Sequence, residues 1–393
     1  MKKTAVAVAV AASALGMSQF AAADFVKDSK LSLDLRNYYF AQETDGGNEG
    51  GQWGQAFMLN YKSGFTEGAV GVGVDLFGGA GYLLADHGDY TGGMLFQHDG
   101  VEANDRLNKA GATVKARAGK TTGYLGALRP NTPVFVANDA RLLPQLVEGV
   151  MVTNQDIAGL TLAAAHVTKV SQRDSDTWAD LGNEFSMLGA DYKVMEGLTA
   201  QYYYGQLNND YQQHFAGLKY SAALGAGKLG ADVRYFNTKD VMDGRVTEDD
   251  ANNLWSALVN YSVVGHTLGL GYQKTSDEFT FRAIGPSKYL ISERMIGAGV
   301  MHNADEAVTL VSYGFDFGTV GVKGLNASVI HQMGDGGTTN IDRTETDVVV
   351  GYTIPEGQFK GLGARLLHGM YRPDAGADID QTRFIVNYSI PLM

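Results

Sequence analysis

The segment Ser29-Lys-Leu-Ser-Leu-Asp-Leu-Arg-Asn-Tyr-Tyr-Phe-Ala41 alternates apolar and polar side chains with a period of two residues. Successive side chains of a β-strand point to opposite faces, so this strand has one apolar face and one charged face. The apolar face carries Leu31, Leu33, Leu35 and Tyr39. The other face carries Ser32, Asp34, Arg36 and Tyr38. In a soluble sandwich the charged face would point to solvent, and in a membrane barrel it would point to a wet lumen.

The connections between such segments distinguish these two folds. Eight short, Gly-rich connections alternate along the chain with nine longer polar or irregular ones, which include residues 130–149, 239–251 and 276–304. Seventeen connections join 18 strands, and outer-membrane barrels have tight turns at one end and long loops at the other. The sequence therefore predicts an all-β fold, an 18-stranded antiparallel transmembrane β-barrel wide enough for an aqueous channel.

The first 23 residues have the three parts of a secretory signal peptide. Lys2 and Lys3 precede an Ala/Val/Leu stretch, and Ala21-Ala22-Ala23 offers a small-residue cleavage site. The apolar stretch is shorter than the 18 or more residues that a membrane-spanning helix needs. We expect residues 1–23 to be a signal peptide and residues 24–393 to form one barrel domain.

Composition excludes several classes of protein. The 393 residues include 31 basic and 43 acidic side chains, and this net charge of −12 argues against a sequence-independent nucleic-acid binder. The absence of cysteine excludes disulfides and thiolate sites. The eight histidines include no pair four residues apart, so no zinc or other metal site is predicted. Nucleophile-elbow, phosphate-loop and HExxH motifs are also absent, although a triad assembled from distant residues stays open.

Aromatic residues cluster near the expected strand ends, for example at Tyr38-Tyr39-Phe40, Tyr202-Tyr203-Tyr204 and Tyr235-Phe236. Amphipathic rings prefer the headgroup level of a membrane, so these clusters are interpreted as an interfacial girdle. The alternative is an ordinary β-core.

Over nearly its whole length after the expected signal peptide, the chain resembles the OprD family of substrate-specific outer-membrane porins. The matching segments include Asp28-Ser-Lys-Leu-Ser-Leu-Asp-Leu-Arg-Asn-Tyr-Tyr-Phe40, Leu59-Asn-Tyr-Lys-Ser-Gly-Phe-Thr-Glu-Gly68, Asn138-Asp-Ala-Arg-Leu-Leu-Pro-Gln145, Gly269-Leu-Gly-Tyr-Gln273 and Lys360-Gly-Leu-Gly363. The resemblance implies passive diffusion of small solutes, often carboxylates, through a monomeric or trimeric channel. It implies no cofactor and no energy coupling.

Several cations fall on the predicted lumen side by strand parity. They are Arg36, Lys62, Lys115, Arg117, Arg234, Arg365 and Arg383, of which Arg36, Lys115, Arg117, Arg365 and Arg383 are assigned to the solute path. Closure of the barrel makes the last two strands and the first strand neighbours, so Arg365, Arg383 and Arg36 would form a cationic ladder on one wall. Arginine suits this role because its planar fork fits a carboxylate. The alternative is that each arginine pairs with a lumenal acid and only supports the barrel.

Two long connections are expected to narrow the pore. Residues 130–149 hold three prolines and the run Val134-Phe-Val136, which an exposed loop would leave in water. We expect this segment to fold inward as a constriction loop, as the third loop does in the resembled family, with Asp139 and Arg141 near the narrowest point. Residues 276–304 are the second candidate, with Tyr289 and Glu293 as polar groups.

The favoured hypothesis is therefore a passive, selective channel for small water-soluble solutes such as organic acids or amino acids, in the outer membrane of a Gram-negative bacterium. The alternatives are a barrel enzyme of the protease or lipase type, and an adhesion or receptor barrel that acts through its loops. Expected partners are the solutes, outer-membrane lipid with lipopolysaccharide, and the barrel-assembly machinery. The oligomer is expected to be a monomer or a homotrimer.

Overall fold

The computed structural model describes residues 25–393 except 90–93, 101, 243–244, 277–289 and 297–299. The expected signal peptide and Tyr289 lie outside the described residues. No helix in the described ranges is long and apolar enough to cross a membrane.

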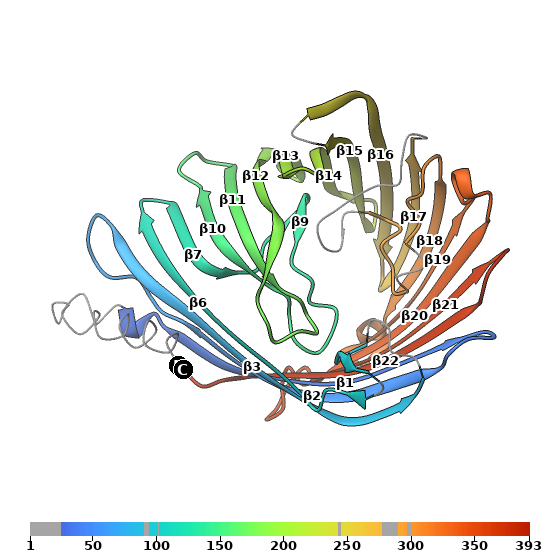
Figure 1. Ribbon diagram of the computed structural model, residues 1–393, viewed down its shortest axis with the longest axis horizontal. Helices are drawn as coiled ribbons and strands as arrows, with labels where there is room; N and C mark the ends of the chain where they lie inside the picture. Colours follow the sequence, from blue (N-terminus) through green and yellow to red (C-terminus); the bar gives the residue numbers. More distant parts are fainter. Residues whose placement is uncertain (1–24, 90–93, 101, 243–244, 277–289, 297–299) are drawn as a thin grey trace.

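Eighteen strands form one antiparallel sheet that closes on itself, because β1 pairs with both β2 and β22 (Figure 1). The strands are β1 (Lys30–Thr44), β2 (Gly50–Lys62), β3 (Gly71–Gly88), β6 (Arg106–Ala118), β7 (Thr121–Leu128), β10 (Leu146–Asn154), β11 (Leu160–Ser171), β12 (Ala179–Met195), β13 (Leu198–Leu207), β14 (Tyr211–Leu224), β15 (Gly227–Met242), β16 (Arg245–Val263), β17 (His266–Thr275), β18 (Ala307–Asp316), β19 (Leu325–Gly334), β20 (Arg343–Thr353), β21 (Gly363–Pro373) and β22 (Ile379–Pro391). The predicted barrel of 18 strands is confirmed.

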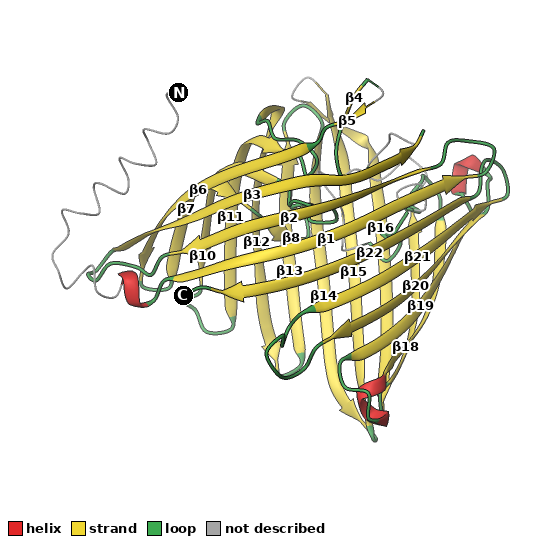
Figure 2. Cartoon of the chain, turned by 90° about the horizontal axis from the view of Figure 1, so that it is seen from below, coloured by secondary structure: helices red, strands yellow, loops and turns green. Residues whose placement is uncertain are grey.

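The strands run obliquely, and the C-terminus lies beside the first residues of β1 (Figure 2). Two-residue turns, such as 119–120 and 225–226, join strands at this end. The long connections lie at the other end, and two of them contain extra two-stranded pieces: β4 (His98–Asp99) with β5 (Glu102–Ala103), and β8 (Asn131–Thr132) with β9 (Phe135–Val136).

One expected loop is mostly strand. Residues 239–251 were predicted to be a long polar connection, but β15 continues to Met242 and β16 begins at Arg245, with Val241 opposite Val246. Backbone pairing continues past a membrane edge whatever the side-chain polarity, so polar composition alone did not mark where the strands end.

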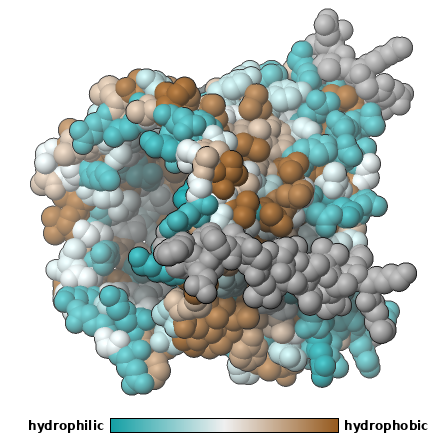
Figure 3. All heavy atoms as spheres, turned by 90° about the vertical axis from the view of Figure 1, so that its left-hand side faces the viewer, coloured by the Kyte–Doolittle hydropathy of each residue, from teal (hydrophilic) through white to brown (hydrophobic). Residues whose placement is uncertain are grey.

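The two faces of the wall differ as the alternation predicts. On β2, Ala56 and Met58 are buried inside, whereas Phe57 and Leu59 are 43% and 46% exposed on the outside. Apolar residues also gather on the outer wall in the side view of Figure 3.

The aromatic clusters are divided by the same alternation. Tyr202 and Tyr235 are exposed on the outer wall, but Tyr203 and Phe236 are buried inside. The girdle interpretation therefore holds for every second ring only, because neighbouring residues of a strand cannot share a face.

Candidate functional site

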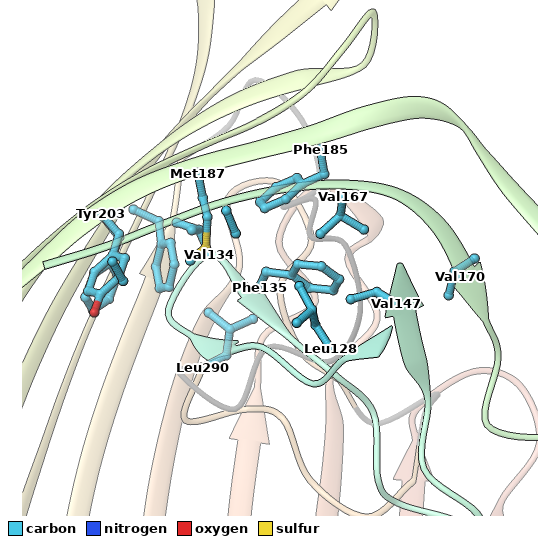
Figure 4. Packing of buried hydrophobic residues seen from close by; sticks show 14 of the residues in the cluster. Leu128, Val134, Phe135, Val147, Val167, Val170, Phe185, Met187, Tyr203 and Leu290 are labelled. Atoms are coloured by element: carbon cyan, nitrogen blue, oxygen red, sulfur yellow. The ribbon is translucent and has the colours of Figure 1, made fainter. Parts of the chain in front are cut away.

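Residues 129–145, between β7 and β10, pack against inward-facing side chains on two parts of the wall. Val134 and Phe135 belong to a buried cluster with Phe185 and Met187 of β12 and Tyr203 of β13 (Figure 4). The ring centroids of Phe135 and Phe185 are 5.1 Å apart. Figure 1 shows β9, which contains Phe135, inside the ring of strands.

The other half of this segment packs on β2 and β3, where glycines leave room for it. Leu142 and Leu143 are fully buried in a second cluster that contains Phe40 of β1. A Cβ atom at Gly54 would lie 2.9 Å from Leu142 Cδ2, and one at Gly79 would lie 3.1 Å from Leu143 Cδ2. The segment therefore contacts side chains of both the β12–β13 wall and the β2–β3 wall.

Arg36 holds this segment in place. Its Nη1 donates to Asp139 Oδ1 at 2.9 Å and to the carbonyl oxygen of Arg141 at 2.6 Å. Its Nε donates to Asn387 Oδ1 of β22 at 3.1 Å. Sequence parity correctly places Arg36 on the inner face, but its guanidinium is occupied by the loop and by β22.

Arg141 and Arg383 lie around one ring. Their Cζ atoms are 4.6 Å and 5.7 Å from the centroid of Phe40. Arg141 also donates to the carbonyl oxygen of Ala140 at 3.0 Å. Arg383 donates through Nε to Gln381 Oε1 at 2.7 Å and through Nη2 to the carbonyl oxygen of Met295. Both cations lie on the same wall, but these contacts give them no acidic residue as a shared partner.

A second inward segment, residues 290–296, packs on β20, β21 and β22. Met295 and Ile296 are buried, and their backbone N–H groups donate to Glu345 Oε1 at 3.0 Å and 2.8 Å. A Cβ atom at Gly369 of β21 would lie 3.2 Å from Met295 Sδ, so this glycine allows the close approach. Glu345 thus fastens the segment to the wall.

The charged groups near this segment include acids that the sequence analysis did not select. Glu345 and Asp347 are both buried on β20. Burial lowers the pKa of Arg294, and the nearby Asp347, Glu345 and Glu293 oppose this shift. The sequence left the acidic side of the constriction open, since Ile296-Gly297-Ala298 carries no acid. The two acids of β20 stand close to that segment instead.

Lys115 and Arg117 lie near the short-turn end of the barrel. Lys115 pairs with Asp75 at 2.6 Å and donates to the carbonyl oxygen of Ser63 at 2.8 Å. Arg117 stacks on Phe65, with Cζ 4.3 Å from the ring centroid. That Lys115 and Arg117 line the solute path stays a prediction. The alternative, in which a lumenal cation pairs with an acid and only supports the barrel, describes Lys115 well.

Besides Arg106 and Arg117, which contact aromatic rings, three arginines of the described ranges have no hydrogen bond or ion pair. They are Arg365 on the inner face of β21, and Arg129 and Arg173 in long connections. Burial lowers the pKa of Arg173, whose charged neighbours include Asp174, Arg383 and Glu293. Strand parity does not predict Arg129 and Arg173, because it says nothing about side chains in loops.

We expect Arg36→Lys to disturb the pore without removing its charge. Lysine keeps the cation but lacks the planar fork that reaches Asp139, Asn387 and a carbonyl together. Single-channel current noise should rise, while the anion preference stays within about two-fold of wild type because the charge is kept. An equally quiet current in Arg36→Lys would show that the loop does not depend on this anchor. Arg365→Lys is the matched control.

The structure is a closed barrel of 18 strands with two inward-packed segments and an arginine-rich wall. Residues 23–392 match the family described as outer membrane porin, OprD family. The chain belongs to the OprD family. It is 29% identical to Porin D of Pseudomonas aeruginosa, and the alignment covers 100% of this chain and 99% of that protein.

Solved structures of OprD-family relatives agree closely with this barrel. OccK8 (OprE) of Pseudomonas aeruginosa is 34% identical, with a TM-score of 0.85 over 94% of this chain and 100% of that one. OpdK of the same organism, solved with vanillate, is 30% identical, with a TM-score of 0.86 over 93% and 100%. This OprD-family chain is therefore a porin of the Gram-negative outer membrane, a channel and not an enzyme.

Proposed function

We propose that this porin passes small carboxylate-bearing solutes by passive diffusion along the wall formed by β21, β22 and β1. The observation that carries the proposal is the uncommitted guanidinium of Arg365, two strands from Arg36 and on the strand next to Arg383. Arg173 adds a cation from a long connection near Arg383. Spaced cations let an anion move between sites without tight binding at any of them.

The two inward-packed segments are proposed to form the constriction. Residues 129–145 bring Asp139 and Arg141 to the inner face of β1, and residues 290–296 bring Glu293 and Arg294 to β20. Cations and acids then face a narrow path together, which favours solutes that carry a carboxylate and a further polar group. That OpdK was solved with vanillate, a carboxylate, supports this class of solute.

The proposal extends to the export, assembly and oligomeric state of the porin. Residues 1–23 would direct export, and the barrel-assembly machinery would insert the chain beside lipopolysaccharide. The channel would work as a monomer or as a homotrimer, with one path in each chain.

Replacing Arg365 should weaken the anion preference. We expect Arg365→Ala to lower the anion-over-cation permeability ratio roughly two- to five-fold at low salt, where screening is least, because a partly exposed charge contributes on the order of 1 kcal/mol. Arg383→Ala should act in the same direction. The measurement is the reversal potential of the purified porin in a planar bilayer, with competition by small acids.

Arg372→Ala is the matched control, because Arg372 lies on the same strand but faces outward and pairs with Asp380 at 2.8 Å. Wild-type ion preference in both Arg365→Ala and Arg383→Ala would contradict the cationic wall.

A further inference from the structure

A cavity of about 880 Å³ lies on the short-turn side of residues 129–145. Its lining includes the ends of β1, β2 and β3 and the C-terminal residues, all at the end of the barrel with short turns. Inward-facing side chains around it include Asp34, Phe77, Thr113, Tyr124 and Met151. Arg129 stands at its border with the inward segment.

Arg129 is exposed, and its side chain borders this interior space. Its Cζ lies 4.2 Å from the centroid of the Phe77 ring. Burial is the main cause that lowers the pKa of Arg129, and the negative charges of Asp139 and Asp34 oppose it only in part. The Arg129 side chain is exposed to the lumen, and it makes no hydrogen bond or ion pair in the described part of the chain.

The nearby carboxylates are engaged elsewhere. Asp139 pairs with Arg36 at 2.9 Å. Asp34 accepts hydrogen bonds from Asn60 at 2.7 Å and from Ser389 at 2.5 Å. Asp75, the other acid of the lining, pairs with Lys115.

The remaining charges of the lining are at the short-turn end of the barrel. Lys30, Lys62 and the terminal carboxylate of Met393 lie there. Arg129 is therefore the cation at the inner end of a cavity whose aspartates already have partners.

We propose that Arg129, stacked on Phe77, is the centre of a second carboxylate-binding site on the periplasmic side of the constriction. The site takes a carboxylate that carries an apolar body. The carboxylate meets the free edge of the Arg129 guanidinium, while the body lies against Phe77, Tyr124 and Met151. The inference rests on the proposed function and deepens it, because it adds a site separate from the cations of β21 and β22.

This position predicts that block of the current depends on the side of the membrane from which the solute is added. A solute added from the periplasmic side reaches Arg129 before it reaches Asp139 and Arg141 of the same segment, so block from that side tests the site directly. The side chains of Phe77, Tyr124 and Met151 give the apolar body of a solute a surface to pack against beside the guanidinium. Benzoate should therefore bind better than acetate, which lacks the apolar body.

The test is block of single-channel current by benzoate and by acetate, added to the periplasmic side at low salt. For Arg129→Gln we expect the benzoate concentration for half-block to rise three- to ten-fold and acetate block to change less than two-fold. Phe77→Leu should raise the benzoate value two- to four-fold. Arg106→Gln is the matched control, since Arg106 also stacks on a ring, that of Tyr82 at 5.9 Å, but on the outer wall.

The outcomes separate this site from the proposed function. Unchanged benzoate block in Arg129→Gln, with wild-type block present, overturns the site and leaves the proposed function standing. Equal losses for benzoate and acetate overturn the apolar part of the site. A wild-type porin that neither acid blocks overturns the proposed function itself. Heat-modifiable migration on gels, measured for every variant, shows that the barrel has folded.

Discussion

Removing residues 134–141 is expected to raise single-channel conductance several-fold and to abolish most of the anion preference. These residues fill part of the interior, and a barrel of 18 strands without them has a wide aqueous lumen. The deletion also removes Asp139 and Arg141, two of the partners of Arg36, and exposes Phe185 and Tyr203 to water. The measurement is the conductance in a planar bilayer together with the reversal potential.

A matched control shortens the connection between β21 and β22 by removing residues 374–377, which lie in an exposed hairpin. Both deletions shorten a connection at the same end of the barrel. Wild-type conductance in the 134–141 deletion, with heat-modifiable migration intact, would place the segment outside the ion path.

Glu345→Ala is expected to release residues 290–296 from the wall. The substitution leaves the buried N–H groups of Met295 and Ile296 without their acceptor, at a cost of about 1–3 kcal/mol each. The segment should then leave the wall often enough to produce frequent open-channel current transitions. Trypsin added from outside should cleave after Arg294, which is part-buried in the intact porin.

Glu345→Gln separates the hydrogen bonds from the charge. Glutamine keeps an amide oxygen that can accept both N–H groups, so cleavage and current should stay close to wild type. If Glu345→Gln and Glu345→Ala behave alike, the charge of Glu345 holds the segment and the hydrogen bonds do not.

The strands of the barrel wall could be predicted from the sequence because side-chain alternation is a local pattern. Alternation at Leu33, Asp34, Leu35 and Arg36 fixes which side chains face inward, and the turns between strands fix the number of strands. The same rule puts Arg365 and Arg383 on the inner face. It did not place the end of β15, because side-chain polarity marks the membrane edge and not the end of backbone pairing.

The candidate site could be predicted from the sequence only in part, because its contacts join distant parts of the chain. Arg36 and Asp139 are 103 positions apart, and no pattern in the sequence relates them. Arg129 follows the last residue of β7, at a point where alternation ends. The sequence did not single out Glu345 and Asp347 of β20, because alternation places them on the inner face like any other lumenal acids. Only their contact with the segment at Met295 distinguishes them.

The join between β1 and β22 has a consequence for assembly. Every other pair of neighbouring strands is consecutive along the barrel and can form as a local hairpin, but this seam brings together residues such as Arg36 and Asn387, 351 positions apart. Closing so long a loop is the entropically costly and slow step, so the seam is expected to close last. Arg36 bridges the seam and the inward segment at once. The proposed constriction would therefore be completed by the same event that closes the barrel, and an intermediate with an open seam would lack it.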